Sequence, residues 1–478
     1  MLTAVLLLAS CGQSGSGTDV TSQDTSAQTS AEQTTADYLS TIEAFDFGGE
    51  PFRIVVNSMS DRPNLHEEEH TGEVINDAMV DRDRKIEEMF KTKLEYTAYE
   101  ARLDLSADLR KLISAGDDVY DVIITTPYEG INVFALNGML SDLSSIGTLD
   151  LSADWWSASM NEAMTHNGRT YATAGPMALC YCYSPYAFFV NLNMAEDYEL
   201  PDVYELVRSG KWTLDSMTSM MKGISEDLNS DGAMGLDDRY GLVTTLEAGK
   251  AFYLGCGQRM AVKTDSGAEL KMDGKSAIDV LEKLSSIMMT DDTICADGKI
   301  SGMGATSDAK IKFFLEARAL FTASPLQWGV INFRDMKDDY AILPYPKYDE
   351  TQDSYYTHMN SYFPYGIAIP ITNTRLDETG AVMEAMAYLS QTTILPKINE
   401  VVLKEKIARD EDSKEMLDIL FENVIIDLNT IFDFGGTARL LRSFAVGESE
   451  NFVSSYASKK SVAEADMQAM FEAYEKLG

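Results

Sequence analysis

The chain has 478 residues, of which 45% are hydrophobic and 10% aromatic, and its 76 acidic and 39 basic residues give a formal net charge of −37. This length exceeds what one compact core holds, so we expect two or three domains. The negative field repels phosphate backbones and anionic membrane surfaces, which argues against a nucleic-acid-binding protein. No run of about 18 apolar residues follows the N-terminal segment, so we expect no membrane-spanning helix in the body of the chain.

The N-terminal segment is short and apolar and ends in LASC at residues 8–11, the pattern of a bacterial lipobox. We therefore predict that Cys11 receives a lipid and becomes the mature N-terminus. No basic residue precedes the apolar run, unlike an ordinary secretory segment, and we expect the true start to lie upstream of Met1. Residues 12–49 open with a Gly-, Ser-, Thr- and Gln-rich run that holds no large apolar residue except Val20. Such a composition predicts a disordered tether between the anchor and the body.

Strand and helix patterns alternate in the first part of the body. Short β-branched runs predict strands, and apolar residues at three- and four-residue spacing predict helices between them. This order indicates a parallel sheet with helices on its faces. The predicted elements are strands at residues 52–56, 94–96 and 122–124 and helices at 75–90 and 103–113.

The third of these strands gives the clearest indication of a site. Residues 122–124 read VII and are followed by Thr125, Thr126 and a proline, as expected of a strand buried on both faces that ends at the surface. Ligands bind beyond the carboxyl ends of strands in open α/β sheets. Thr126 and Tyr128 therefore become candidate ligand contacts, unless this is an ordinary core strand followed by a surface loop.

Residues 66–70 read HEEEH and match the letters of the zinc-protease motif H-E-x-x-H. That motif needs a packed helix that places both imidazoles on one face. Here the five residues are polar throughout, and they lie between Pro63 and Gly72. A third ligand such as Glu88 fits the spacing, but the sequence favours a solvated loop.

Two further features have both a structural and a functional interpretation. Trp155 and Trp156 could stack on a sugar ring, although paired tryptophans more often pack in a core. Cys180 and Cys182 stand too close together for an easy mutual disulfide, and we expect Cys180, Cys182, Cys256 and Cys295 to be mostly buried, with a bridge between distant cysteines left open.

Residues 227–238 read DLNSDGAMGLDD and fit the spacing of a calcium loop, with glycine at the sixth position and a carboxylate at the twelfth. Aspartate at the twelfth position predicts weaker binding than glutamate would give. A metal-free turn is the alternative. The predicted Ca²⁺ ligands are the side chains of Asp227, Asn229, Asp231 and Asp238 and the carbonyl group of Ala233.

The rest of the body repeats the strand and helix patterns. Beyond residue 377 the sequence is mostly helical, with few turn signals. Thr213 is a predicted helix N-cap before a methionine-rich apolar face. The predicted strands lie at residues 188–191, 240–243, 319–322, 341–346 and 365–370, with helices at 276–289 and 310–316.

Together these segments resemble the extracellular solute-binding lipoproteins of bacterial ABC importers, of the sugar-binding, family 1-like type. The resemblance covers nearly the whole chain beyond the tether. The residues that carry it are the lipobox, YDVI at 120–123, GKWT at 210–213 with the loop that follows, LPYPKYD at 343–349, ARDEDS at 408–413 and EMLD at 415–418.

The resemblance implies an α/β, two-lobed periplasmic-binding-protein-like fold of type II, with hinge strands between the lobes and the ligand in the cleft between them. Lobe 1 would hold residues 50–176 and 363–410, and lobe 2 residues 177–362 and 411–478. Carried over by position, the implied ligand contacts are Asn57, Asp61, Thr126, Tyr128, Tyr181, Tyr183 and Trp328.

The implied function is reversible binding of a sugar or oligosaccharide by a monomer that delivers it to ABC permease subunits, without catalysis. The protein would be held at the extracellular face of the cell membrane by its lipid alone. One alternative is a secreted hydrolase, either a glycosidase or a zinc protease; no G-x-S-x-G, phosphate-loop or G-x-G-x-x-G motif is present. A surface sensor without a permease is the other alternative.

Overall fold

The computed structural model describes residues 38–59, 66–264, 267–295, 307–333, 336–402, 411–445 and 452–476. The chain forms two compact units, Met1–Ile42 and Glu43–Gly478. The described end of the first unit is a single turn, in which the backbone N–H of Thr41 donates to the carbonyl of Tyr38 over 2.9 Å. Cys11, Asp61 and most of the predicted tether lie outside the described residues. All that follows concerns the second unit.

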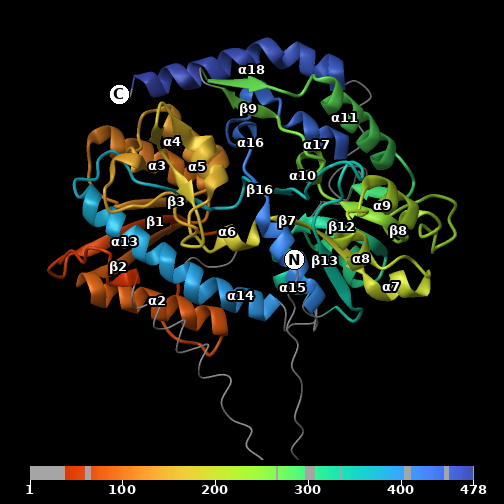
Figure 1. Ribbon diagram of the computed structural model, residues 1–478, viewed down its shortest axis with the longest axis horizontal. Helices are drawn as coiled ribbons and strands as arrows, with labels where there is room; N and C mark the ends of the chain where they lie inside the picture. Colours follow the sequence, from red (N-terminus) through yellow and green to blue (C-terminus); the bar gives the residue numbers. More distant parts are fainter. Residues whose placement is uncertain are drawn as a thin grey trace, which may run out of the picture. The chain divides into compact units, whose positions relative to one another are not determined.

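The first sheet has five strands in the order β2-β1-β3-β15-β6; Figure 1 labels β1, β2 and β3. β1 lies between β2 and β3 and is parallel to both, as the sequence predicts, with Ile54 paired to Val122. β15 comes from far along the chain and adds antiparallel to β3. The strands are β1 (Pro51–Asn57), β2 (Lys93–Tyr99), β3 (Val122–Thr125), β6 (Thr173–Ala174) and β15 (Gly366–Ala368).

Helices cover both faces of this sheet (Figure 1). α2 buries Met79, Ile86 and Phe90 and packs against α13, while α3 ends at Gly116, whose φ of 80° suits glycine. A short β4–β5 hairpin (Thr165–His166, Arg169–Thr170) stands beside them. The helices are α2 (Val74–Phe90), α3 (Arg102–Ala115), η1 (Pro127–Ile131), α4 (Asn132–Leu136), η2 (Leu143–Ser145), α5 (Ala158–Met164), α13 (Leu376–Leu389), η4 (Ser390–Ile394) and α14 (Leu395–Val402).

The second sheet also has five strands, in the order β11-β8-β12-β7-β13. β8 is parallel to its neighbours β11 and β12, whereas β7 is antiparallel to β12 and β13. Its core is aromatic, because the buried rings of Phe188, Phe321 and Trp212 contact one another. The strands are β7 (Tyr186–Asn191), β8 (Tyr240–Thr244), β11 (Thr293–Cys295), β12 (Ala319–Pro325) and β13 (Tyr340–Leu343).

The remaining α-helices vary in length from 4 residues in α6 to 24 residues in α18. α9 begins at the predicted N-cap, where Thr213 and Ser216 form a reciprocal capping box. The helices are α6 (Cys180–Tyr183), α7 (Leu192–Asp197), α8 (Val203–Arg208), α9 (Leu214–Met221), α10 (Ala248–Gly255), α11 (Lys275–Met288), α12 (Ser307–Leu315), η3 (Trp328–Asn332), α15 (Glu411–Glu422), α16 (Leu428–Phe432), η6 (Phe434–Gly436), α17 (Leu440–Ala445) and α18 (Phe452–Glu475).

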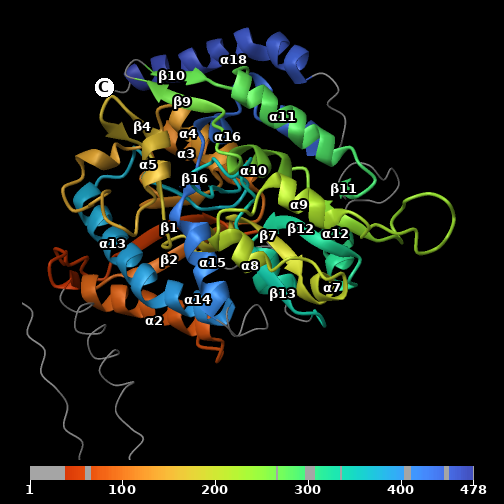
Figure 2. The ribbon, with the colours of Figure 1, turned by 45° about the vertical axis from the view of Figure 1, so that its right-hand side comes forward.

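The second unit has two halves, one built around each five-stranded sheet. Elements outside these sheets link the two halves. β14 (Thr357–His358) pairs in parallel with β16 (Val424–Ile425), and β9 (Ala261–Thr264) forms a hairpin with β10 (Gly267–Leu270). The long helix α18 lies along this hairpin (Figure 2) and reaches the first half, where Tyr474 stacks on Tyr171 at a centroid distance of 4.9 Å. Helix α18 therefore contacts both halves.

The described residues contain no helix long and apolar enough to cross a bilayer. Cys180, Cys182 and Cys256 are buried free thiols, and their burial agrees with the prediction. The lobe boundaries stay predictions, but the α/β class is confirmed, with parallel strands in each of two helix-covered sheets.

Candidate ligand-binding site

Segments that follow the carboxyl ends of strands in both sheets meet at Tyr362. From the first sheet, Tyr128 follows β3 and contacts the Tyr362 ring edge-on, with the centroids 5.2 Å apart at 66°. From the second sheet, Lys250 lies on α10, which follows β8, and its Nζ is 5.4 Å from the same ring centroid. This is the region where open α/β sheets bind ligands.

Two arginines also approach the ring of Tyr362. The Cζ atoms of Arg102 and Arg442 lie 5.5 Å and 5.9 Å from its centroid, within the range of cation–π contact. Arg102 comes from the start of α3 and Arg442 from α17, which packs on α10. With their ion-pair partners, and with the Arg439–Asp433 pair whose charges act on the Tyr128 and Tyr362 hydroxyls, these residues form what we call the Tyr362 cluster: Arg102, Tyr128, Glu129, Glu247, Lys250, Tyr362, Asp433, Arg439 and Arg442.

Every carboxylate of the cluster is bound to a cation. Arg102 donates through Nε and Nη2 to Oε2 of Glu129, at 2.8 Å and 2.5 Å. Glu247 bridges two cations, since its Oε2 lies 3.0 Å from Nζ of Lys250 and its Oε1 lies 2.9 Å from Nε of Arg442. These ion pairs and the ring contacts of Tyr362 thus join elements of both halves.

Burial sets the chemistry of the phenol groups and of the third carboxylate. Burial raises the pKa of both Tyr128 and Tyr362, so each hydroxyl stays protonated at neutral pH and can donate a hydrogen bond. Asp433 is buried, which raises its pKa, and it pairs with Nε of Arg439. Within the described residues, neither phenol hydroxyl makes a hydrogen bond, so both are available to a ligand.

A tight turn after β3 presents Tyr128 and Glu129. Glu129 has a φ of 59°, and Gly130 follows in close contact with Thr125, where an added Cβ would lie 2.8 Å from the threonine Cγ2. Thr126 is buried, and its Oγ1 donates to the carbonyl of Tyr128 over 2.7 Å. Thr126 therefore supports the turn, while Tyr128 makes the ring contact.

The structure gathers the predicted contacts only in part. Asn57 is buried at the end of β1; its Nδ2 donates to the carbonyls of Tyr99 and Glu100 at 2.9 Å and 3.2 Å, and its Oδ1 has no partner among the described residues. It therefore holds the β1–β2 edge. Asp61 lies outside the described residues.

The other predicted aromatic contacts lie in packed surroundings. Tyr181 meets Tyr365 edge-on at 6.2 Å, and Trp328 meets Phe333 edge-on at 6.3 Å. Tyr183 and Trp328 are buried. Of the predicted aromatic residues, Tyr128 is the one whose ring contacts Tyr362.

Most of the cluster was not predicted from the sequence. Lys250 does leave a signal, because α10 reads AGKAFYLG and carries one charge in an otherwise apolar, buried helix. A charge at such a position needs a partner, which here is Glu247. Tyr362 lies just before the predicted strand at residues 365–370 and leaves no periodic signal.

No protein-family model matches this chain. No curated protein matches it either. Solved structures do. The ABC substrate-binding protein Lmo0181 of Listeria monocytogenes, in complex with cycloalternan, matches with a TM-score of 0.54 and 12% identity over 89% of this chain and 99% of that chain. The GacH receptor of Streptomyces glaucescens, solved unliganded and with acarbose or an acarbose homolog, matches with a TM-score of 0.54 and 13% identity over 90% of this chain and 98% of that chain.

The chain has the fold of these ABC substrate-binding proteins. This confirms the predicted two-lobed, periplasmic-binding-protein-like class. The Tyr362 cluster draws on elements of both halves.

The zinc-protease alternative finds no support in the fold. Residues 66–70 are not helical, and the two histidines bind different partners. Nδ1 of His66 lies 3.0 Å from Asp83, whereas Nε2 of His70 lies 2.9 Å from Asp81. No group of three or more His, Cys, Asp or Glu side chains among the described residues is placed to hold a metal ion.

The paired tryptophans are packing residues. The indole N–H groups of Trp155 and Trp156 both donate to the buried carboxylate of Glu384 on α13, at 3.0 Å and 2.9 Å. The pair fixes α13 to the loop that precedes α5. This agrees with the structural interpretation of the two tryptophans.

The calcium-like loop is closed by its own hydrogen bonds. Asp227 accepts from the backbone N–H of Gly232 at 2.8 Å, and the buried carboxylate of Asp238 accepts from Leu228 and Gly235 at 2.9 Å and 2.5 Å. Oδ1 of Asp227 is buried without a partner among the described residues. One oxygen atom, Oδ1 of Asp227, therefore fits a cation, whereas the carboxylate of Asp238 already accepts backbone hydrogen bonds within the loop.

A separate cavity of about 270 Å³ lies between α5, β9 and the segment from β16 to α16. Its lining includes Glu162, Arg259, Lys263 and Asp427 but no aromatic side chain. Burial lowers the pKa of Lys263 to about 8 and raises that of Asp427 to about 6. This cavity offers charge without the aromatic faces that sugar rings use.

Proposed function

We propose that this protein is the extracellular solute-binding component of an ABC transport system and binds a sugar or oligosaccharide reversibly at the Tyr362 cluster. The observation that carries the proposal is the meeting of Tyr128, after β3, with Lys250, after β8, at the ring of Tyr362. The fold supports it, since the two similar substrate-binding structures hold cycloalternan and acarbose.

The chemistry of the cluster suits a saccharide. The rings of Tyr128 and Tyr362 stand at 66° and offer faces for the C–H side of a sugar ring. Their protonated hydroxyls donate, and the fixed carboxylates accept from sugar hydroxyls. Closure of the lobes over the ligand would desolvate these hydrogen bonds and mark the loaded state for permease subunits.

The same contacts argue against a hydrolase at this site. A glycosidase uses one carboxylic acid to protonate the leaving group and a second carboxylate across the substrate. Glu129 and Glu247 are each bound by an arginine, and Glu247 also by Lys250. We therefore expect the protein to release its saccharide unchanged, which chromatography of the recovered ligand would check.

A ligand screen on the purified chain tests the function. The unfolding temperature would be measured with mono- and oligosaccharides, with peptides and with no addition. A saccharide at a hundredfold excess over its Kd adds about 2.7 kcal/mol of stability. If peptides raise the unfolding temperature and no saccharide does, the assignment to sugars is wrong.

We further propose that the protein is a monomer anchored to the extracellular face of the cell membrane through a lipid on Cys11. The LASC pattern and the polar run after it support the lipid anchor. Metabolic labelling with a radioactive fatty acid should mark the wild-type chain and not Cys11→Ser. Equal labelling of both chains would refute the anchor.

We also propose that the loop at residues 227–238 binds calcium weakly. The ligand spacing and the unpartnered Oδ1 of Asp227 support this. Calcium should raise the unfolding temperature relative to a chelator, and Asp227→Asn should remove the difference. No shift in the wild-type chain would rule out the calcium site.

A further inference from the structure

The accessible groups of the Tyr362 cluster are mainly guanidinium groups. The side chains of Arg102, Arg439 and Arg442 are 28%, 54% and 33% exposed. Of the carboxylates, Glu129 is 34% exposed, whereas Asp433 and Glu247 are only 5% and 13% exposed. Three of the four clearly exposed charged side chains of the cluster are therefore cations.

The arginines are held in a way that leaves their terminal N–H groups open. Arg439 and Arg442 each pair with an internal carboxylate through Nε, with Asp433 and Glu247 respectively. Among the described residues, the Nη1 and Nη2 groups of these two arginines have no acceptor. Arg102 uses Nε and Nη2 on Glu129 and keeps Nη1. Such terminal pairs of N–H groups match the two oxygens of a carboxylate or sulfate.

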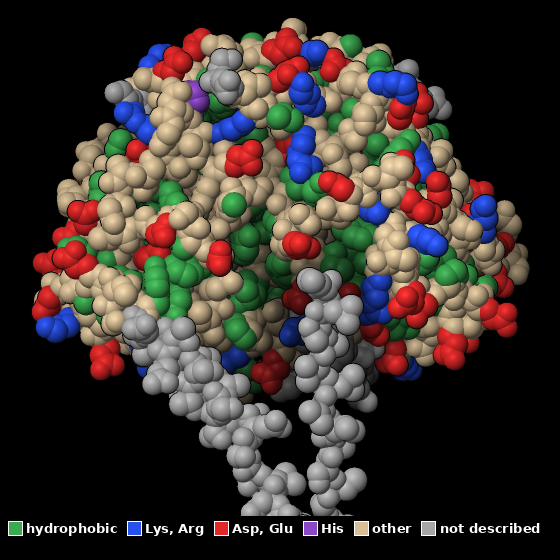
Figure 3. Space-filling view, viewed as in Figure 1, with side chains coloured by type: hydrophobic (Ala, Val, Ile, Leu, Met, Phe, Trp, Pro, Cys, Tyr) green, Lys and Arg blue, Asp and Glu red, His purple; other side chains and the backbone are tan. Residues whose placement is uncertain are grey.

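The charge of the cluster does not balance internally. Its four cations face three carboxylates, so one positive charge remains in a chain whose net charge is −37. Acidic side chains are spread widely over the surface shown in Figure 3. Lys459 and Asp466, which both bind Gly435 beside the cluster, cancel each other. Lys250 contributes a buried ammonium group, and a buried charge is costly unless it is compensated.

We propose that the ligand is an acidic saccharide, whose carboxylate or sulfate group is bound by the terminal N–H groups of Arg439 and Arg442 while its ring lies against Tyr362. The anion supplies the missing negative charge and the acceptors for the open donors. This inference rests on the proposed function, because it names the class of saccharide that the same site takes.

Calorimetric titration of the purified full chain with matched pairs of ligands tests it. The carboxylate arm compares trigalacturonate with galactotriose, and the sulfate arm compares a sulfated galactobiose with galactobiose. At least one acidic ligand should bind at least about tenfold more tightly than its neutral partner, because one charge-assisted hydrogen bond contributes a difference in affinity of this size.

Variants connect that preference to the arginines. Arg442→Gln and Arg439→Gln should each reduce the ratio of the affinity for the acidic ligand to the affinity for its neutral partner about tenfold. Arg442→Lys keeps the charge but loses the paired N–H groups, so it should fall between Arg442→Gln and the wild type. Arg208→Gln is the matched control, because Arg208 pairs with Glu205, Asp412 and Glu415 on the surface.

The outcomes separate this inference from the proposed function. If neutral saccharides bind as tightly as their acidic partners, or if the arginine variants keep the full preference, the acidic-saccharide inference is overturned and the solute-binding function stands. If no saccharide of either kind binds, the proposed function fails and the inference fails with it.

Discussion

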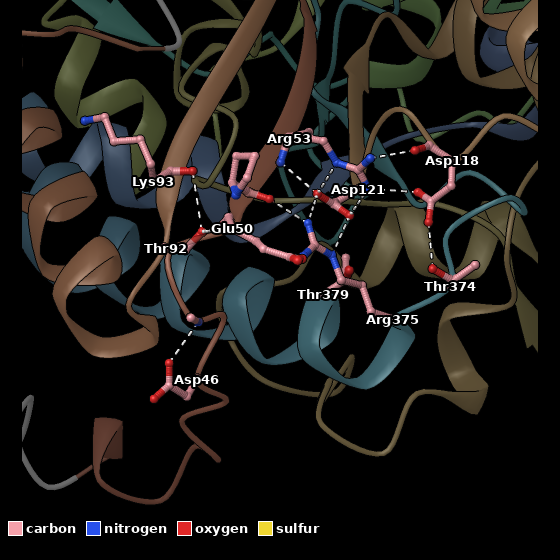
Figure 4. A network of polar contacts seen from close by, with 12 residues as sticks. Asp46, Glu50, Arg53, Thr92, Lys93, Asp118, Asp121, Thr374, Arg375 and Thr379 are labelled. Atoms are coloured by element: carbon pink, nitrogen blue, oxygen red, sulfur yellow. Dashed lines mark hydrogen bonds and ion pairs between the residues drawn. The ribbon is translucent and has the colours of Figure 1, made fainter.

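Arginine–carboxylate networks occur at both ends of the first sheet, and they differ in how their donors are used. At the amino ends of β1 and β3, Arg53 and Arg375 converge on Asp121, whose side chain is 0% exposed (Figure 4). Oδ2 of Asp121 accepts from N and Nε of Arg53 at 2.7 Å and 3.1 Å and from Nη2 of Arg375 at 2.8 Å. Its Oδ1 accepts from Nη2 of Arg53 at 2.8 Å and from Nε of Arg375 at 3.0 Å.

Other donors of Arg53 and Arg375 are also used within the fold, whereas, among the described residues, Nη1 of Arg375 makes only a 3.7 Å ion pair with the exposed Glu50. Nη1 of Arg53 donates to the carbonyl of Asp118 at 2.5 Å, and Nη2 of Arg375 also donates to the carbonyl of Pro51 at 2.6 Å. In the Tyr362 cluster, by contrast, Arg439 and Arg442 use Nε and leave their terminal N–H groups open. We infer that a network whose donors are mostly used within the fold stabilises the fold, and we propose that the network with open donors binds a ligand.

The largest effect that this comparison predicts is on stability. Asp121→Ala leaves two guanidinium groups without their shared partner, so the free energy of unfolding should fall by about 3–5 kcal/mol. Urea unfolding would measure it, with the partly exposed Asp118→Ala as a milder control. Saccharide affinity of the folded fraction should not change. A loss below about 1 kcal/mol would show that the network does not stabilise the fold.

The pH dependence of stability sharpens the same point. Burial alone would raise the pKa of Asp121, but hydrogen bonds from Arg53 and Arg375 outweigh burial and hold the pKa below its usual value. Because the folded-state pKa is lowered, the stabilisation is fully present above the unfolded-state pKa near 3.9 and is lost as the pH falls through the folded-state pKa. The difference in unfolding free energy between wild type and Asp121→Asn should therefore be constant from about pH 7 to pH 5 and shrink below about pH 4. A difference that grows on acidification would contradict this sign.

Tyr362 should show the opposite behaviour to Asp121. Tyr362→Ala removes the ring that Tyr128 and Lys250 approach, so saccharide affinity should fall about tenfold or more. This loss is close to the upper end of the free energy that one aromatic contact contributes. The free energy of unfolding should change much less than in Asp121→Ala. Calorimetric titration and urea unfolding of the same preparation would measure both. Unchanged affinity with a large loss of stability would make Tyr362 a structural residue.

The smallest effect is expected for an exposed network that belongs to neither region. Arg208 pairs with three carboxylates at the surface, where solvent screens ion pairs. Arg208→Gln should change the free energy of unfolding by less than about 1 kcal/mol and leave saccharide affinity unchanged. A larger change in either quantity would mean that the exposed Arg208 pairs do not differ from the Asp121 network or the Tyr362 cluster as described.

The fold was predictable from the sequence largely because its signals are local. The VII run at 122–124 and the spacing of Met79, Ile86 and Phe90 depend on neighbouring residues, and both elements formed as predicted. The antiparallel return of β15 beside β3 was not predicted, because pairing between distant strands leaves no periodic trace.

The site was less predictable, since it is assembled from distant segments. Tyr128 was found because it follows a recognisable strand, whereas Tyr362, Lys250 and Arg442 meet only through tertiary packing. Trp328 was predicted as a ligand contact but packs edge-on against Phe333. Core burial stabilises an aromatic side chain, and the position of the residue in the sequence does not show whether it is buried.

The most direct test of the central claim is a crystal structure of the full chain with a bound saccharide. The account predicts a sugar ring against Tyr362 and Tyr128, with its polar groups within hydrogen-bond distance of Arg439 or Arg442. A saccharide bound instead in the cavity beside Arg259, with the Tyr362 cluster untouched, would contradict it.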